Sequence, residues 1–366
     1  MRRIDFLNLR STYTELKNEI DTAINQVLDS GWYVLGKEVQ SFEEDWASFC
    51  GAKYCAGLGS GLDALTISLK ALSIGNNDEV IVPSNTYIAT WLAVENVGAK
   101  IIPVEPNPEI FNIDPYKIEE LITPNTKAII PVHLYGQPAD MNPILRLAKK
   151  YDLKVIEDAA QAHGTEYFGT RIGCHGNVVC WSFYPGKNLG AFGDAGAITT
   201  NNKEIYERIK VIRNYGSEKK YHNEIKGLNS RLDPIQAAVL KVKLKYLASW
   251  NERRQYISEL YFKYLSNKHF QLPFVPEYSK SCWHQFIIRS KRREEIIEYL
   301  TSFGVSTLIH YPIPPHKQKA YLNNDFSNFS LNISETLSKE LLSLPIGPHL
   351  DKEDCIKICR LLSEFK

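Results

Sequence analysis

A single lysine, Lys187, lies in the segment SFYPGKN, where aromatic and apolar residues surround it. A given lysine is more often a solvated surface residue, but these neighbours would keep water away from the amine. Burial lowers the pKa of a lysine from about 10.4 and leaves a neutral amine that attacks carbonyl groups. A phosphate-binding P-loop is excluded, because that motif requires Ser or Thr after its lysine and this chain has Asn188. The segment therefore predicts a nucleophilic lysine.

A carboxylate, Asp158, ends the apolar run KVIED, and Gln161 and His163 follow it at short distance. A buried carboxylate is costly unless a cation or hydrogen-bond donors answer its charge. We therefore expect a cationic partner near Asp158. The alternative is that Asp158 only caps the segment that follows it.

A glycine-rich turn, GLGSGLDAL, brings Gly59, Ser60 and Gly61 directly after another apolar run. If the turn opens a helix, its free N–H groups and the Ser60 hydroxyl could hold a phosphate. The alternative is a tight turn that needs glycine only for backbone freedom. The spacing does not fit a dinucleotide fingerprint, because Leu62 stands where the last glycine is required, and this disfavours a NAD site.

One ligand, pyridoxal 5'-phosphate, would account for the lysine, the carboxylate and the glycine-rich turn together. A lysine binds its aldehyde as a Schiff base, a carboxylate keeps its pyridine nitrogen protonated, and a phosphate cup anchors it. A carboxylate and a pyridinium about 4 Å apart attract by ~4 kcal/mol at an effective dielectric of ~20. Tyr87, which follows the run EVIVP, could stack on the cofactor ring, although core packing is the alternative.

Short runs rich in Val and Ile alternate with segments of helical period from residue 54 onward. This alternation predicts an α/β fold with a mainly parallel sheet, and the continuous apolar runs indicate strands buried on both faces. In such sheets ligands gather at the carboxyl ends of the strands, which is where the candidate residues stand. The expected strands are residues 54–58, 79–83, 100–105, 127–134, 154–158, 178–183 and 195–200.

A second, smaller unit is expected toward the C-terminus. Asp233 and Pro234 predict the start of one long helix, or two nearly collinear helices, that reaches about residue 268 and bridges two domains. The later run FIIRS and the tail from residue 339 predict an α+β unit. We therefore expect a large cofactor-binding domain at residues 1–250 and a small C-terminal domain at residues 251–366.

Charge and cysteine content limit the partners and the compartment. Lys and Arg total 43 and Asp and Glu total 42, so no global basic field attracts nucleic acid or an anionic membrane. The seven cysteines form no metal-binding spacing, and the N-terminus shows no apolar signal segment. We expect a cytoplasmic protein that binds small molecules, spans no membrane and holds no metal.

The motifs GSGLDAL, EDAAQAHG and SFYPGKN occur in this order, together with SGWYVLGKEVQSFEEDWASFCGAKY, PSNTYIATWLAV, PVHLYGQPADM, GLNSRLDPIQAAVL and IHYPIPPHKQKAY. In this respect the chain resembles the DegT/DnrJ/StrS family of nucleotide-sugar aminotransferases, and the likeness covers almost its whole length. The resemblance implies the pyridoxal-phosphate fold of type I, which is that of aspartate aminotransferase.

The resemblance also implies a role for each motif residue. Lys187 would bond covalently to the cofactor, Asp158 would meet the pyridine nitrogen, and Tyr87 would stack on the ring. In the family an asparagine of the GxNxR motif reaches the phosphate from the neighbouring subunit; it corresponds to Asn229 and implies a homodimer with shared active sites. The expected cofactor-binding set is Ser60, Gly61, Tyr87, Asp158, Gln161, Ser182, Lys187 and Asn229. The expected sugar-facing set is Tyr184, Gln161, Lys220, His310 and Tyr311.

The run KNLGAFGDAGA after the lysine resembles the family members that aminate the third carbon of dTDP-linked 3-keto-6-deoxyhexoses. Members that aminate the fourth carbon commonly have KNxTTGEGG instead. The implied reaction carries an amino group from L-glutamate to the nucleotide-linked keto-sugar and gives a dTDP-3-amino-3,6-dideoxyhexose, for which we favour the gluco over the galacto epimer.

Four alternatives stay open beside this interpretation. The first is amination at a different keto position of a nucleotide sugar. The second is a dehydratase of the same fold, in which the family replaces the lysine with histidine, so that Lys187 argues against it. The others are a non-catalytic regulatory protein that binds the cofactor and an NAD-dependent sugar enzyme.

Overall fold

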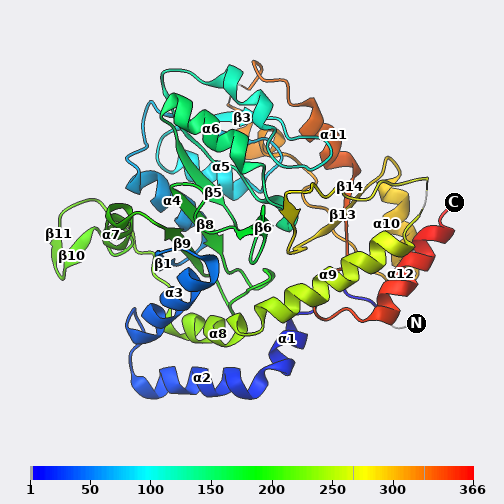
Figure 1. The fold of residues 1–366 in the computed structure, drawn as a ribbon, viewed down its shortest axis with the longest axis horizontal. Coiled ribbons are helices and arrows are strands. Elements are labelled where there is room, and N and C mark those ends of the chain that lie inside the picture. The colour runs from blue at the N-terminus through cyan, green and yellow to red at the C-terminus, as the bar shows by residue number, and fades with distance from the viewer. Residues whose placement is uncertain (1–2, 267, 325) are drawn as a thin grey trace.

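The computed structural model describes residues 3–266, 268–324 and 326–366. Its centre is a seven-stranded sheet with the strand order β1-β9-β8-β5-β4-β2-β3 (Figure 1). Strand β9 runs antiparallel to both of its neighbours, whereas the other adjacent pairs are parallel, so the predicted mainly parallel α/β sheet is confirmed. The strands are β1 (Tyr54–Leu58), β2 (Glu79–Pro83), β3 (Lys100–Val104), β4 (Thr126–Ile129), β5 (Lys154–Asp158), β8 (Val178–Ser182) and β9 (Gly196–Thr200).

Helices cover both faces of this sheet because alternate side chains of each strand point to opposite sides. One buried cluster joins Ile81, Val155 and Trp181 to helices α3, α6 and α8. A second joins Val80 and Ile156 to helices α4, α5 and α7 on the other side. The helices of the two layers are α3 (Lys37–Cys50), α6 (Met141–Tyr151), α8 (Pro234–Leu244), α4 (Gly61–Ala71), α5 (Ile88–Glu95) and α7 (Lys203–Ile212).

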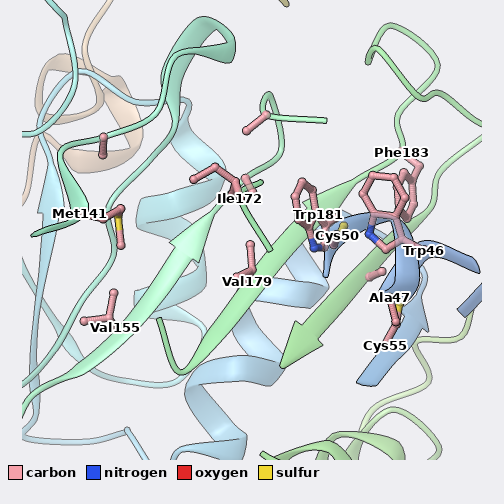
Figure 2. Packing of buried hydrophobic residues seen from close by; sticks show 14 of the residues in the cluster. Trp46, Ala47, Cys50, Cys55, Met141, Val155, Ile172, Val179, Trp181 and Phe183 are labelled. Carbon is pink, nitrogen blue, oxygen red and sulfur yellow. The ribbon is translucent and has the colours of Figure 1, made fainter. Parts of the chain in front are cut away.

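Aromatic packing fixes strand β8 against helix α3. Figure 2 shows Trp46 of α3 beside Trp181 and Phe183. The ring centroids of Trp46 and Trp181 are 5.0 Å apart at 89°, and those of Trp46 and Phe183 are 5.3 Å apart at 86°. Such edge-to-face contacts add to the stabilisation from burial. They hold the carboxyl end of β8 in place, where the chain turns toward Lys187.

The long helical region after Asp233 is two helices, as one of the two predicted forms had it. Helix α8 ends at Leu244, and α9 (Leu247–Tyr264) follows after a break in which Tyr246 has φ −104° and ψ −7°. Helix α9 is shorter than expected, because Leu265 already has extended backbone. In Figure 1 α9 runs from the sheet toward the C-terminal helices.

A separate hydrophobic cluster lies in the C-terminal part of the chain. It combines residues between Ile257 and Phe365 with Ile4, whose backbone pairs with Val305. The domain boundary at residue 250 stays a prediction, with α9 spanning it. The elements of this part are β12 (Ser279–Lys280), β13 (Phe286–Arg289), α10 (Arg293–Ser302), α11 (Asn332–Glu340), β14 (Leu341–Leu344) and α12 (Lys352–Glu364).

Smaller elements complete the chain. Strands β10 and β11 form a hairpin that projects from the molecule in Figure 1, beside α7. No helix within the three described ranges is long and apolar enough to cross a membrane. Besides short 3₁₀ helices, the remaining elements are α1 (Leu9–Glu15), α2 (Lys17–Ser30), β6 (Glu166–Tyr167), β7 (Thr170–Arg171), β10 (Ser217–Lys219) and β11 (His222–Asn223).

Candidate active site

The candidate residues meet at one edge of the sheet. Strands β1, β5 and β8 are parallel, so their carboxyl ends share an edge with Gly196, the first residue of the antiparallel β9. Asp158 and Ser182 are the last residues of β5 and β8, and Ser60 follows β1 as the N-cap of α4. The topology therefore gathers segments that lie more than a hundred residues apart in the sequence.

Asp158 is a buried carboxylate with two hydrogen-bond donors. Its Oδ2 accepts from the hydroxyl of Thr90 at 2.9 Å, and its Oδ1 accepts from the N–H of Ala160 at 3.2 Å. Burial raises the pKa of Asp158, whereas these donors and the charge of Lys187 act in the opposite direction. Burial has the larger effect, so without a ligand the protonated form of Asp158 is more favoured than in a solvated aspartate. A cation beside this carboxylate would favour its ionised form.

Lys187 follows the end of β8 in a turn that its own N–H closes by donating to the carbonyl of Tyr184 at 2.8 Å. Its side chain keeps a little accessible surface but is enclosed by protein, and this burial lowers its pKa to about 8 against the opposing effect of Asp158. Among the described residues, no direct ion pair joins Lys187 to Asp158, and no protein group accepts a hydrogen bond from its amine. Because Lys187 and Asp158 influence each other without direct contact, a flat ring could bind between their side chains.

The turn between β1 and α4 forms a close-fitting cradle. A Cβ added at Gly61 would lie 2.7 Å from Cβ of Ser182, and one added at Gly196 would collide with the carbonyl of Ser60. The hydroxyl oxygen of Ser60 accepts a hydrogen bond from the N–H of Asp63 at 3.1 Å. Its hydrogen stays available for an anion, so capping and phosphate binding are compatible at this residue.

A second group of side chains lies above this edge. The rings of Tyr87 and Tyr311 are 5.2 Å apart, and Gln161 donates from Nε2 to the hydroxyl of Tyr311 at 3.0 Å. Gln161 Oε1 accepts from the N–H of Tyr135 at 2.6 Å. The adjacent His310 is bonded through Nδ1 to Ser343 Oγ at 2.7 Å, and burial, followed by the charge of Lys187, lowers the pKa of His310 to about 4. The structure thus joins Tyr87, Gln161 and His310–Tyr311 into one wall.

Four of the predicted residues are exposed in this chain, and one of them, Tyr87, is 55% exposed although its ring lies near that of Tyr311. Tyr184 is exposed just beyond Ser182, Asn229 is exposed in a loop whose backbone pairs with Asn214, and Lys220 lies at the tip of the β10–β11 hairpin. The Lys220 amine contacts the ring of the neighbouring Tyr221 at 5.0 Å. Figure 1 shows this hairpin projecting from the molecule beside α7.

The cavities that touch Lys187 and Tyr311 are small, with volumes of about 30 Å³ and 10 Å³. Larger cavities of about 620 Å³ and 840 Å³ contain neither Lys187 nor Asp158; the first lies at the opposite edge, beside Lys154. The chemistry, and not the size of the cavity, therefore locates the site.

Sequence reasoning missed several residues that the structure places in or beside the site. Thr90 binds Asp158, Tyr135 binds Gln161, and Ser230 bonds to the Gly59 N–H and to Asp63. Thr90 stands one helical turn after Tyr87, and that spacing is a signal that could have indicated it. The others depend on contacts between distant segments. Among the described residues, no group of three or more His, Cys, Asp or Glu side chains is placed to hold a metal ion.

The residues fit pyridoxal phosphate: an amine with a lowered pKa, a buried carboxylate across from it, and a glycine cradle at a helix N-terminus at the same sheet edge. Fold and site together define the class of pyridoxal-phosphate-dependent aminotransferases. Comparison with known proteins narrows the class, since residues 14–363 match the DegT/DnrJ/EryC1/StrS aminotransferase family. The chain belongs to this family.

Several relatives and solved structures are similar over nearly the whole chain. The chain is 53% identical to the dTDP-3-amino-3,6-dideoxy-alpha-D-galactopyranose transaminase of Aneurinibacillus thermoaerophilus, covering 99% of each chain. It is 47% identical to the dTDP-3-amino-3,4,6-trideoxy-alpha-D-glucose transaminase of Streptomyces venezuelae, covering 99% of this chain and 96% of the relative. The crystal structure of S. venezuelae DesV in complex with a ketimine intermediate has a TM-score of 0.97, with 47% identity over 100% of this chain and 98% of that one.

Proposed function

We propose that the protein transfers the amino group of L-glutamate to the third carbon of a dTDP-3-keto-6-deoxyhexose. The product is a dTDP-3-amino-3,6-dideoxyhexose. The observation that carries the proposal is that Lys187 and Asp158, both buried, influence each other's charge at the carboxyl edge of the sheet in a chain of this aminotransferase family. The names of both relatives place the amino group on the third carbon, which supports this position.

Pyridoxal phosphate, when bound, supplies an aldehyde that accepts the amino group and a ring that withdraws electrons from the reacting carbon. Lys187 would hold the aldehyde through its neutral amine and, once released, move a proton at the substrate carbon. Asp158 would hold the proton on the pyridine nitrogen, with Thr90 keeping the carboxylate in place. Tyr87 would cover the ring on one side.

The phosphate would lie at the start of helix α4, held by the Ser60 hydroxyl, the Gly61 N–H and Ser182. Asn229 of the partner subunit would complete the phosphate site. The exposed apolar segment around Trp32, Tyr33 and Val34, with exposures of 64%, 51% and 48%, supports a homodimer, because such patches usually mark an interface.

The keto-sugar would face Tyr184, Gln161, His310 and Tyr311, and Lys220 of the partner subunit would reach it across the interface. We expect the gluco epimer as substrate. The galacto epimer is the competing substrate, because the relative at 53% identity is named for a galactopyranose product. We place the protein in the cytoplasm, since its seven cysteines are all free thiols, as a reducing compartment requires.

The cofactor part is tested by the absorption spectrum of the purified protein. We expect a band near the edge of the visible range that is altered in Lys187→Ala. The substrate part is tested by incubating the enzyme with L-glutamate and each of the two dTDP-3-keto-6-deoxyhexose epimers and measuring 2-oxoglutarate. A missing band contradicts the cofactor assignment, and no 2-oxoglutarate with either epimer contradicts the third-carbon assignment.

A further inference from the structure

Ser230 connects the loop that carries Asn229 to the phosphate-binding turn of the same chain. The Ser230 side chain is buried, with 3% exposure. Its hydroxyl donates to Oδ2 of Asp63 at 2.7 Å and accepts from the N–H of Gly59 at 3.0 Å. The hydroxyl thus both donates to and accepts from the turn between β1 and α4.

These two bonds set the shape of the turn that would hold the phosphate. Asp63 also donates its N–H to Ser60 Oγ at 3.1 Å, so Gly59, Ser60 and Asp63 form one connected unit with Ser230. Asp63 is the acidic residue in the first turn of α4. Because Ser230 engages its carboxylate, that charge is partly satisfied before an anion arrives; without this bond the carboxylate would repel a phosphate more strongly.

The backbone of Ser230 is held by hydrogen bonds as well. Its N–H donates to the carbonyl of Arg213 at 3.0 Å, and Leu228 donates to Ile212 at 2.7 Å. The backbone of Asn229 is therefore held between two anchored residues while its side chain is exposed.

A buried ion pair ties this loop to the end of β1. Arg213 pairs with Glu43 and donates to the carbonyl of Gly57 at 2.7 Å, and Glu43 accepts from the N–H of Gly57 at 2.7 Å. A buried pair is costly to assemble unless further hydrogen bonds satisfy it, as they do here. The turn and the Asn229 loop are thus two ends of one rigid unit.

We propose that Ser230 is a positioning residue that couples the two active sites of the dimer. It orders the phosphate turn of its own subunit and, through the same hydrogen bonds, fixes the direction in which Asn229 is presented to the partner subunit. Each Ser230 thereby supports both phosphate sites of the dimer, one through the turn and the other through Asn229. This inference rests on the proposed function, which supplies the cofactor and the shared site.

The first experiment measures the dissociation constant of pyridoxal phosphate from the apo-dimer of Ser230→Ala. Loss of the hydroxyl leaves Asp63 and the Gly59 N–H without their buried partner, so we expect binding about tenfold weaker than wild type. Ser258→Ala is the matched control: Ser258 is equally buried, and its hydroxyl donates to the carbonyl of Gln255 at 2.7 Å in helix α9, away from the turn. Unchanged affinity in Ser230→Ala overturns the proposal.

The second experiment separates the effect on each subunit with co-expressed, differently tagged chains. Lys187→Ala in one chain leaves a mixed dimer with one site that can bond the cofactor covalently. In the cis arrangement Ser230→Ala lies in the competent chain. In the trans arrangement Ser230→Ala lies in the Lys187→Ala chain. The substitution can then affect the competent site only through Asn229, which the Lys187→Ala chain contributes to that site. Pyridoxal phosphate is added stepwise to both arrangements and to a reference dimer that keeps Ser230 in both chains, and the growth of the visible absorption band gives the affinity.

We expect cofactor affinity at the single competent site to fall at least about threefold in both arrangements. A loss confined to the cis arrangement overturns the coupling, because Ser230 then serves only its own turn. The reference dimer differs from each arrangement only at Ser230. If the reference dimer binds the cofactor normally, a weaker affinity in either arrangement is therefore caused by the Ser230→Ala substitution. A wild-type chain that is monomeric or binds no cofactor overturns the proposed function and this inference together.

Discussion

At the level of single residues, the two groups that define the site have pKa values displaced by burial. Burial raises the pKa of Asp158 and lowers that of Lys187 to about 8, and each counteracts the displacement of the other. Groups displaced in this way at the edge of a sheet are typical of catalytic sites. Their displacement has consequences that can be measured.

Replacing Asp158 by Asn keeps the shape of the side chain but removes the negative charge. We expect kcat for amino transfer to fall about a hundredfold or more, because the charge that would hold the pyridine nitrogen protonated is lost. Thr90→Val, which removes only the hydroxyl that donates to Asp158 at 2.9 Å, should cause a smaller loss of about tenfold. Equal losses in the two variants would contradict the charge-based role of Asp158.

Covalent capture of pyridoxal phosphate by the apoenzyme should depend on pH through Lys187. The reactive form of the amine is the neutral one, and its lowered pKa of about 8 means that this form increases as the pH rises through 8. Stopped-flow absorbance should therefore show the second-order capture rate rising with pH and levelling off above about pH 9. A midpoint near 10.5, the pKa of an unperturbed lysine, would show that burial does not act on this amine.

At the level of elements, the turn between β1 and α4 has no space for a side chain at Gly61. In Gly61→Ala the new methyl group would lie 2.7 Å from Cβ of Ser182. We expect pyridoxal-phosphate affinity to fall at least about tenfold, because the cradle must open to accept the methyl group.

The matched control for Gly61→Ala is Gly75→Ala. A methyl group at Gly75 would have its nearest neighbour, the carbonyl of Val97, at 3.4 Å. This variant should bind the cofactor as wild type does. Normal cofactor affinity in Gly61→Ala would exclude the turn as the phosphate site.

The strands were predictable from the sequence because they are continuous apolar runs buried on both faces. The expected strand at 154–158 and its terminal Asp158 agree with β5, and the lysine motif follows β8 as expected. The expected strand at 127–134 was too long, because β4 ends at Ile129 and the chain then makes one isolated bridge at Val132 and enters a 3₁₀ helix at Leu134. Backbone hydrogen bonds to β2 and β5 continue past Ile129, from the N–H of Ile130 to the carbonyl of Ile81 at 2.8 Å and from the N–H of His133 to the carbonyl of Asp158 at 3.0 Å, but they no longer form a regular strand.

The supporting contacts of the site were not predictable. Thr90 meets Asp158 across 68 positions of sequence, and Ser230 meets Asp63 across 167. The spacing of Thr90 from Tyr87 is the one local signal, and nothing local marks Ser230, since a serine in a loop is equally compatible with a solvated side chain. Only the packing of the sheet and its helices brings them together.

At the level of the whole molecule, the proposed homodimer can be tested through the β10–β11 hairpin. Lys220, at the tip of this hairpin, is exposed. If Lys220 of the partner subunit contacts the sugar, Lys220→Ala should raise KM for the keto-sugar about tenfold and leave the reaction with L-glutamate unchanged. Steady-state and single-turnover assays separate the two.

Lys219→Ala, beside it in the same hairpin, is the control for a general loss of charge on this surface. An increase in KM for L-glutamate of the same size in Lys220→Ala would contradict a contact with the sugar. Sedimentation of both variants checks that the dimer is retained.

The proposed reaction places an amino group on the third carbon of a dTDP-keto-sugar. Its most direct test is incubation of the holoenzyme with L-[¹⁵N]glutamate and dTDP-3-keto-6-deoxyglucose, followed by NMR of the nucleotide-sugar product. We expect ¹⁵N bonded to the third carbon and no such product with Lys187→Ala. A product labelled at another carbon, or no labelled sugar from either keto-sugar epimer, would contradict the account.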